Sequence, residues 1–233
     1  MTKLSNIFAG FAALSSSFFI DVSASAAVFI FDGVNPGPTA VDAPVNATTP
    51  CGSPGFDFCD VGNVGFDYSR DGVSFNAQGL SAGAPSVIIQ DINGLNQGLG
   101  VMSEGRFLLD QINADADESI LFTFTEQVVL SNIELNNGTG QDCPFVGVEG
   151  GCGLLDIVID RGLLSETTLS DIVAIEVLTS NFVGTTFEFI ATTAGEGFSI
   201  ASLEVVVPLP ASLPLFLAGI LCFGAVSRKK RIN

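Results

Sequence analysis

Much of the chain alternates between apolar and polar residues with the two-residue period of a β-strand. Ile120, Phe122 and Phe124 alternate with threonines, and residues 187–191 repeat the pattern around Glu188. Successive side chains of a strand point to opposite faces, so we expect one face to be buried and the other, with Glu188, to face water. The pattern predicts short strands at residues 28–31, 72–76, 86–90, 119–125, 128–135, 154–160, 187–191 and 198–207.

Together these strands predict one all-β domain over residues 27–206, built as an antiparallel two-sheet sandwich of the jelly-roll or galactose-binding-like kind. Residues 165–178 have a spacing that fits either a short helix or a strand. Residues 35–55 are rich in Pro and Gly and are expected to form a long loop within the domain.

The first 26 residues have the features of a secretory signal peptide. Lys3 supplies a positive charge, residues 7–20 are apolar, and small residues follow. Ala24-Ser25-Ala26 fits the site that signal peptidase cleaves, which places cleavage before Ala27. An uncleaved anchor helix is the alternative, but about 14 apolar residues are short for a hydrocarbon core of roughly 30 Å.

The C-terminal end carries a second hydrophobic segment. Residues 209–226 have no charge, and the cluster Arg228, Lys229, Lys230 and Arg231 follows. At about 1.5 Å per residue this segment forms a helix of roughly 27 Å, which is enough to span a bilayer core. Because positive charges remain on the cytoplasmic side, we expect one C-terminal transmembrane helix with the domain outside.

A short motif overlaps the start of this segment: Val207, Pro208, Leu209, Pro210 and Ala211. Motif, apolar helix and terminal basic cluster in this order resemble the VPLPA variant of the PEP-CTERM sorting signals of Gram-negative bacteria. The resemblance covers residues 207–233. It implies recognition by an exosortase, a membrane-embedded transpeptidase-like enzyme, with residues 212–227 as a transient anchor and the basic cluster as a stop. An ordinary single-pass anchor, whose prolines only end the preceding strand, is the alternative.

Charge and composition exclude several functions. The chain has 25 acidic and 8 basic residues, and no His. Between the two ends only Arg70, Arg106 and Arg161 remain against 24 acidic residues, all of the 25 except Asp21, so nucleic acids would be repelled. Without His there is neither a Ser-His-Asp triad nor His-ligated zinc, and a domain without Lys has no Schiff-base or P-loop lysine.

Four of the five cysteines form two pairs that are close in sequence, Cys51 with Cys59 and Cys143 with Cys152. An exported protein meets conditions that permit disulfides, and four cysteines allow three pairings. The local pairing needs no assumption about the fold, and each bridge would contribute about 2.5 kcal/mol. A four-cysteine zinc site is the alternative, although its usual spacing is absent. Cys222 lies in the predicted helix.

An acidic segment is the candidate metal site. Asp110, Asn113, Asp115 and Asp117 offer oxygen ligands at short intervals, as a calcium loop does, and extracellular calcium is abundant enough to fill weak sites. The glycine and the bidentate glutamate of an EF-hand are missing. The alternative is a solvated turn whose Asp and Asn side chains hydrogen-bond to their own backbone. Calcium is the only cofactor that the sequence suggests.

These observations predict a non-catalytic protein of the cell surface or extracellular matrix, with signal peptidase and exosortase as processing partners. Its expected role is structural or adhesive and linked to exopolysaccharide. A calcium-dependent carbohydrate-binding module is one alternative, weakened by the absence of Trp and by Tyr68 being the single Tyr. A glycoside hydrolase is the other, because that chemistry needs only two carboxyl groups about 5 to 10 Å apart.

Overall fold

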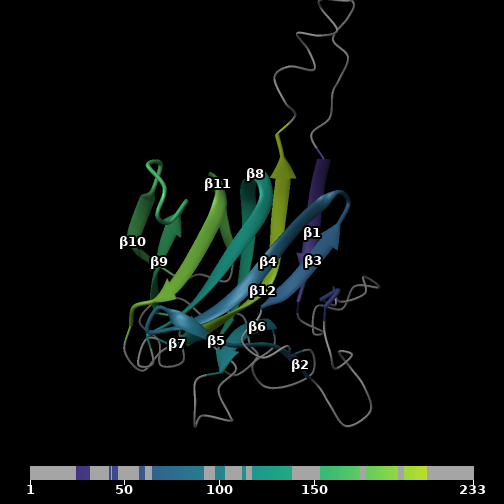
Figure 1. Ribbon diagram of the computed structural model, residues 1–233. Helices are drawn as coiled ribbons and strands as arrows, with labels where there is room; N and C mark the ends of the chain where they lie inside the picture. Colours follow the sequence, from purple (N-terminus) through teal and green to yellow (C-terminus); the bar gives the residue numbers. More distant parts are fainter. Residues whose placement is uncertain are drawn as a thin grey trace, which may run out of the picture. The chain divides into compact units, whose positions relative to one another are not determined.

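The computed structural model describes residues 25–31, 42, 44–46, 58–60, 65–91, 98–102, 112–113, 117–137, 153–173, 177–193 and 197–208. This part of the chain is all-β, as predicted (Figure 1). Its strands are β1 (Ser25–Ile30), β2 (Phe58–Asp60), β3 (Phe66–Arg70), β4 (Val73–Ser81), β5 (Ala84–Asp91), β6 (Gly98–Met102), β7 (Ile112–Asn113), β8 (Glu118–Asn137), β9 (Leu154–Ile159), β10 (Thr167–Val173), β11 (Val177–Ala191) and β12 (Gly197–Val207). None of these residues belongs to a helix long and apolar enough to cross a membrane.

The described strand pairs are all antiparallel. Hydrogen bonds connect the strands in the order β1-β12-β6-β5-β4-β8-β11-β9-β10, while β3 pairs with β4, β2 with β5 and β7 with β12. β12 also pairs with β8, so that β12, β6, β5, β4 and β8 form a closed ring. The strands therefore make one continuous network, whose two layers share strands.

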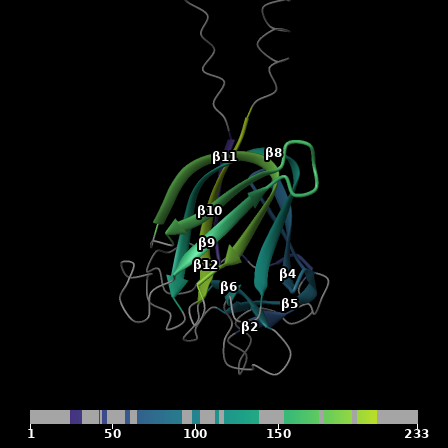
Figure 2. The same cartoon turned by 90° about the vertical axis from the view of Figure 1, so that its left-hand side faces the viewer.

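The two longest strands, β8 and β11, connect the layers. β8 pairs with β4 through its first half and with β12 through its second half, and β11 lies beside both halves. Between the halves, residues 124–127 of β8 lie opposite Thr185 alone, because the register shifts between Gly184 and Thr186. Both strands arch over at this level (Figure 2). The arch joins a layer with β3, β4, β9 and β10 to a layer with β1 and β12, which gives a sandwich-like fold.

The core between the layers is rich in phenylalanine. Phe29 of β1 meets Phe75 of β4 edge to face with ring centroids 4.8 Å apart, so the two layers are in direct contact. Phe75 meets Phe122 in the same geometry, and Phe122 meets Phe189. Each such pair adds about 0.5–1.5 kcal/mol to the stabilisation from burial alone. One connected aromatic cluster therefore holds both layers together.

Several sequence predictions can be checked against these strands. The alternation at 120–125 is confirmed, since the apolar residues at 120, 122 and 124 are buried and Thr123 and Thr125 are exposed. The strands predicted at 119–125 and 128–135 are the two halves of β8, joined through the arch. The helix reading of 165–178 is wrong where the structure describes it, because β10 occupies Thr167–Val173 and β11 begins at Val177.

Candidate functional site

The first and last strands of the domain lie side by side. The compact unit runs from Ser25 to Pro208, and β1 pairs with β12 from Ser25 opposite Val207 to Ile30 opposite Ser202. Val207 of the predicted sorting motif therefore ends a strand, and Pro208 follows it in an exposed position. The remaining residues of the motif and of the basic stop lie outside the described residues: Leu209, Pro210, Ala211, Arg228, Lys229, Lys230 and Arg231.

Residues 1–24 of the predicted signal peptide and the predicted transmembrane helix also lie outside the described residues, as do Cys51, Cys143 and Cys152. Ser25 and Ala26, the last residues of the predicted signal peptide, begin β1. Cys59 lies on β2 opposite Gln90, but its side chain is not described. The disulfide pairing stays a prediction.

The candidate calcium segment is described only in part. Asp110 and Asp115 lie outside the described residues, and Asn113 lies on β7 without a described side chain. Asp117 is exposed, has a φ of 48°, and accepts a hydrogen bond from the Ala82 N–H through its backbone oxygen. Among the side chains that the structure describes, no group of three or more His, Cys, Asp or Glu could hold a metal ion. Calcium binding stays a prediction, while the backbone of Asp117 forms part of a turn.

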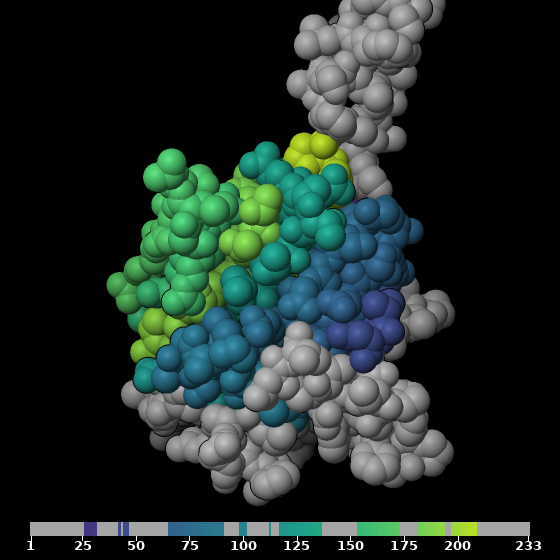
Figure 3. Space-filling model, viewed as in Figure 1, coloured from purple at the N-terminus to yellow at the C-terminus, as the bar shows by residue number. Residues whose placement is uncertain are grey.

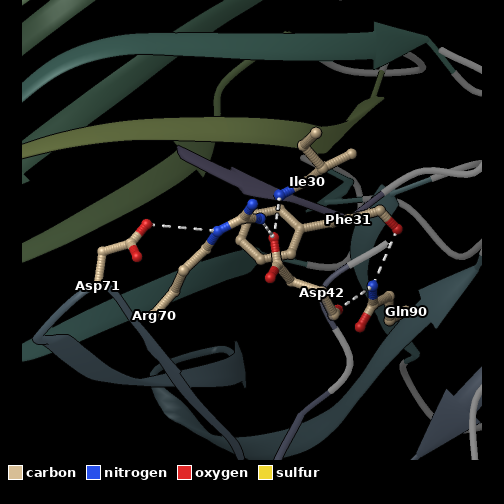
Figure 4. Close-up of polar contacts among 6 residues, drawn as sticks. All are labelled: Ile30, Phe31, Asp42, Arg70, Asp71 and Gln90. Carbon is tan, nitrogen blue, oxygen red and sulfur yellow. Dashed lines mark hydrogen bonds and ion pairs between the residues drawn. The ribbon is translucent and has the colours of Figure 1, made fainter. Parts of the chain in front are cut away.

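A polar network fixes the end of β1 (Figure 4). The Asp42 carboxylate accepts hydrogen bonds from the Ile30 N–H at 2.8 Å and from the Arg70 guanidinium at 2.7 Å. The Asp42 N–H donates in return to the Ile30 carbonyl at 2.8 Å. Arg70 is the last residue of β3, so this ion pair ties β1, residue 42 and β3 together.

The same network continues into the core through Gln90 of β5. The fully buried Gln90 amide donates to the carbonyl oxygens of Phe31 and Asp42 at 3.0 and 2.9 Å, and accepts from the Tyr68 hydroxyl at 2.8 Å. Burial and the neighbouring Asp42 charge raise the pKa of Tyr68 well above its ordinary value. Tyr68 is therefore held as a neutral hydrogen-bond donor.

A second network fills the arch of β11. Asp160, directly after β9, accepts hydrogen bonds at a single carboxylate oxygen from the Thr185 N–H at 2.7 Å, the Thr185 hydroxyl at 2.9 Å and the Thr186 N–H at 3.2 Å. The Ser165 hydroxyl donates to its other oxygen at 3.2 Å. The register shift leaves Thr185 without a partner on β8, and the carboxylate gives the amides of Thr185 and Thr186 an acceptor.

The electrostatics of Asp160 follow from these contacts. Burial alone would raise the pKa of Asp160, but the hydrogen bonds from Thr185, Thr186 and Ser165 outweigh burial and lower the pKa below its ordinary value. Gly184 makes room for the side chain, because a Cβ there would lie 2.6 Å from the Ile159 side chain and 3.0 Å from the Asp160 carboxylate. The arch therefore requires an ionised aspartate and a glycine together.

The prediction that Glu188 faces water is wrong. We expected it on a water-facing side of its strand, but it is 2% exposed. Its carboxylate accepts a hydrogen bond from the Ser119 hydroxyl at 2.7 Å and forms an ion pair with Arg161 of the β9–β10 connection. The connection therefore covers this part of the outer face, which two-residue periodicity along one strand does not reveal.

These three carboxylates are engaged in holding strands. Asp42 binds Arg70 and a backbone amide, Asp160 binds four neutral donors, and Glu188 binds Ser119 and Arg161. A general acid or base must instead reach the proton that it transfers on a substrate. In the described geometry these three carboxylates thus serve to hold strands and loops together. Sequence reasoning did not single out Asp42 or Asp160, since an aspartate after a strand or in a loop is typical of any turn.

Comparisons with known proteins do not identify a family for this chain. No family model matches the chain, and no curated protein matches it. Among solved structures, the family 32 carbohydrate-binding module of C. perfringens NanJ, determined in complex with galactose, is 17% identical and has a TM-score of 0.30. The match covers 57% of this chain and 92% of the module. Similarity at this level establishes neither the detailed fold nor a ligand.

Proposed function

We propose that this chain is an exported protein of the cell surface or extracellular matrix of a Gram-negative bacterium. Residues 1–26 would direct it across the inner membrane, and signal peptidase would remove them. Residues 207–233 would hold it there until an exosortase acts at the motif. The domain between, a β-sandwich of the jelly-roll or galactose-binding-like kind, would have a structural or adhesive role linked to exopolysaccharide.

The observation that carries this proposal is the pairing of β1 with β12. The twelve described strands lie between Ser25 and Val207, and these two residues are direct partners. A cut before Ala27 removes only Ser25 and Ala26 from β1, and a cut behind Val207 removes no strand residue, so the rest of the network stays in place. A domain of this kind tolerates the removal of both flanking segments, as two-step processing requires.

Charge supports the adhesive role. The domain has a large excess of acidic residues and no Lys, and the described basic side chains Arg70 and Arg161 are both bound to carboxylates. Divalent cations can bridge such a surface to an acidic polysaccharide, whereas direct contact between the two would be repulsive. The engagement of Asp42, Asp160 and Glu188 in strand contacts supports this role over that of a carboxylate hydrolase.

The sorting step is tested in the native host with a Pro208→Ala/Pro210→Ala double variant, since both prolines belong to the motif. We expect wild-type protein to reach the cell exterior in a form shortened at both ends, and the variant to stay in the membrane fraction with its tail. Mass spectrometry of the purified protein identifies both ends and the disulfides. Pro85→Ala, at an exposed proline of β5, is the matched control and should be processed normally. Unshortened wild-type protein with free thiols in the cytosol would refute the proposal.

The adhesive role needs a separate measurement. We expect the secreted protein to sediment with isolated exopolysaccharide in the presence of calcium and to be released by a chelator. Sedimentation that is unaffected by chelation would contradict cation bridging. Hydrolysis of the polysaccharide, abolished by replacing one carboxylate, would establish the enzyme alternative instead.

A further inference from the structure

Partly or fully exposed apolar residues gather where β1 begins and β12 ends. Val183 of β11 pairs with Val129 of β8, Val129 pairs with Val206 of β12, and Val206 pairs with Ala26 of β1. With about 4.8 Å between neighbouring strands, this row is roughly 15 Å long. Val183 is 49% exposed and directly precedes the arch that Asp160 fills. The arch and the two ends of the domain therefore lie at the same level.

The β9–β10 connection extends this end with two leucines. Leu163 is 53% exposed, and Leu164 is exposed completely. Hydrogen bonds hold the connection in place, from the Leu163 N–H to the Asp160 carbonyl at 3.0 Å and from the Glu166 N–H to the Leu163 carbonyl at 3.1 Å. Figure 3 shows the green atoms of this connection projecting, and Figures 1 and 2 place it at the end where β12 finishes. We call Leu163 and Leu164 the leucine tip.

Five large apolar side chains are exposed among the described residues, and Leu163, Leu164 and Val183 are three of them. Single exposed apolar residues are common and need no explanation. Here two adjacent leucines stand on a turn that the Asp160 and Glu166 hydrogen bonds hold in shape. Such a turn presents its leucines without losing further conformational freedom on binding, which favours contact with an apolar phase.

We propose that the leucine tip enters the boundary between headgroups and acyl chains of the membrane that holds the precursor. The inference rests on the proposed function, because the uncharged residues 209–226 supply the anchor. Pro208 ends the described domain at the same end as the tip, and only residues 209–211 separate it in sequence from the predicted anchor at 212–227. So short a connection would keep this end of the domain close to the bilayer, where leucine side chains are stabilised by leaving water.

Charge identifies the kind of lipid surface. The Arg161 charge beside the tip is bound to Glu188, and Glu166 adds an exposed carboxylate. The domain therefore gains nothing from anionic lipids and is repelled by them. The contact is apolar, so it should form on zwitterionic phosphatidylcholine and weaken as anionic lipid is added.

The test uses the full chain reconstituted into phosphatidylcholine vesicles in which part of the lipid carries bromine on its acyl chains. The chain has no Trp, so Leu164→Trp places a single indole at the tip. Ala84→Trp is the matched control, because Ala84 is exposed and lies at the far end of β4 and β8, opposite the arch. We expect a blue-shifted emission and strong bromine quenching for the tip variant, and neither for the control. Adding Leu163→Ser to the tip variant should reduce the quenching.

Two outcomes would overturn the inference. One is equal, weak quenching of the tip and control variants in vesicles that hold the chain. The other is a blue shift that grows with protein concentration without bromine quenching, which would assign the tip to a contact with a second copy. Alkaline carbonate extraction measures anchoring independently, and its failure would count against the proposed function. Without anchoring, bromine quenching of the tip would still support lipid contact, and its absence would reject it.

Discussion

The carboxylates of Asp42 and Asp160 stabilise two regions of the domain by different means. Asp42 is partly exposed and meets a cation, Arg70, together with one backbone amide. Asp160 is buried and meets only neutral donors, two of them amides of the arch in β11. The first contact attaches a separate segment of chain to the sheet. The second completes a strand that would otherwise have unpaired backbone groups.

This difference shows where the domain depends on an ionised group. An ion pair at a partly exposed site is screened by water and salt, and replacing it leaves groups that solvent can reach. Loss of the Asp160 carboxylate leaves two partly buried amides without an acceptor, which costs about 1–3 kcal/mol for each group. We therefore expect the arch to be the more sensitive of the two regions.

The largest effect should come from Asp160→Ala, which removes the acceptor of Thr185 and Thr186 and leaves a cavity between β9 and β11. We expect the free energy of unfolding to fall by about 4 kcal/mol, measured by urea denaturation. Glu166→Gln is the matched control, because that exposed carboxylate of the same connection accepts one loop N–H and should cost about 0.5 kcal/mol. Equal losses for the two variants would contradict the role given to Asp160.

The second effect should come from Gln90→Leu, which keeps the volume but removes the partner of Tyr68, Phe31 and Asp42. Three polar groups would lose their contact with Gln90, and we expect a loss of about 3 kcal/mol. Gln78→Leu on neighbouring β4 is the control, since Gln78 is only partly buried. Calorimetric unfolding of both variants measures the difference, and a neutral Gln90→Leu would show that the network adds no stability.

The third effect is a loss of stability at acid pH. The folded-state pKa of Asp160 is lowered, so its contribution is complete above the pKa of an unfolded Asp, about 3.9. It should decline as the pH falls through the folded-state pKa. Asp160→Asn should cost about 2 kcal/mol at pH 7 and flatten this part of the pH profile of stability. Urea midpoints between pH 7 and pH 2 test this, and parallel profiles for wild type and variant would count against it.

The smallest effect is a loss of stability at alkaline pH. Tyr68 has a raised folded-state pKa, so stability is retained below the ordinary tyrosine pKa of about 10 and lost as the pH rises above it. Because Tyr68 is the single Tyr, ultraviolet absorbance reports its ionisation directly. We expect ionisation to coincide with unfolding. Tyr68→Phe should cost about 1 kcal/mol at neutral pH and remove this alkaline loss; ionisation of Tyr68 in a folded chain would contradict its burial.

The sequence predicted the parts of the fold that depend on local periodicity. Residues 119–125 and 187–191 have the spacing of half-buried strands, and the structure places both in strands. The arch was missed because residues 124–127 look like the end of one strand and the start of another. What joins them is the neighbouring strand β11, which bends at the same level. A contact between distant parts of the chain leaves no local pattern.

The polar networks were harder to predict for the same reason. Asp160 is separated from Thr185 by 25 residues, and Asp42 from Gln90 by 48. Nothing near Glu188 shows that Arg161 will cover it. The Gly-Thr-Thr sequence at 184–186 could have suggested an irregular strand, since glycine is common at bulges. Its acceptor could not have been named from the sequence.

The pairing of β1 with β12 has a consequence for the order of maturation. If signal peptidase cuts before Ala27, the new terminus carries an ammonium group at a residue whose side chain is wholly inside the protein. The cut also strips Val206 and Val207 of their described partners on β1. The tail would then begin with an extended backbone open on one flank, the form in which peptides are commonly held by adding a strand to a sheet. Removal of the signal peptide thus exposes one side of the backbone where the sorting motif begins. In a precursor that kept its signal peptide, β1 would still cover that start of the motif.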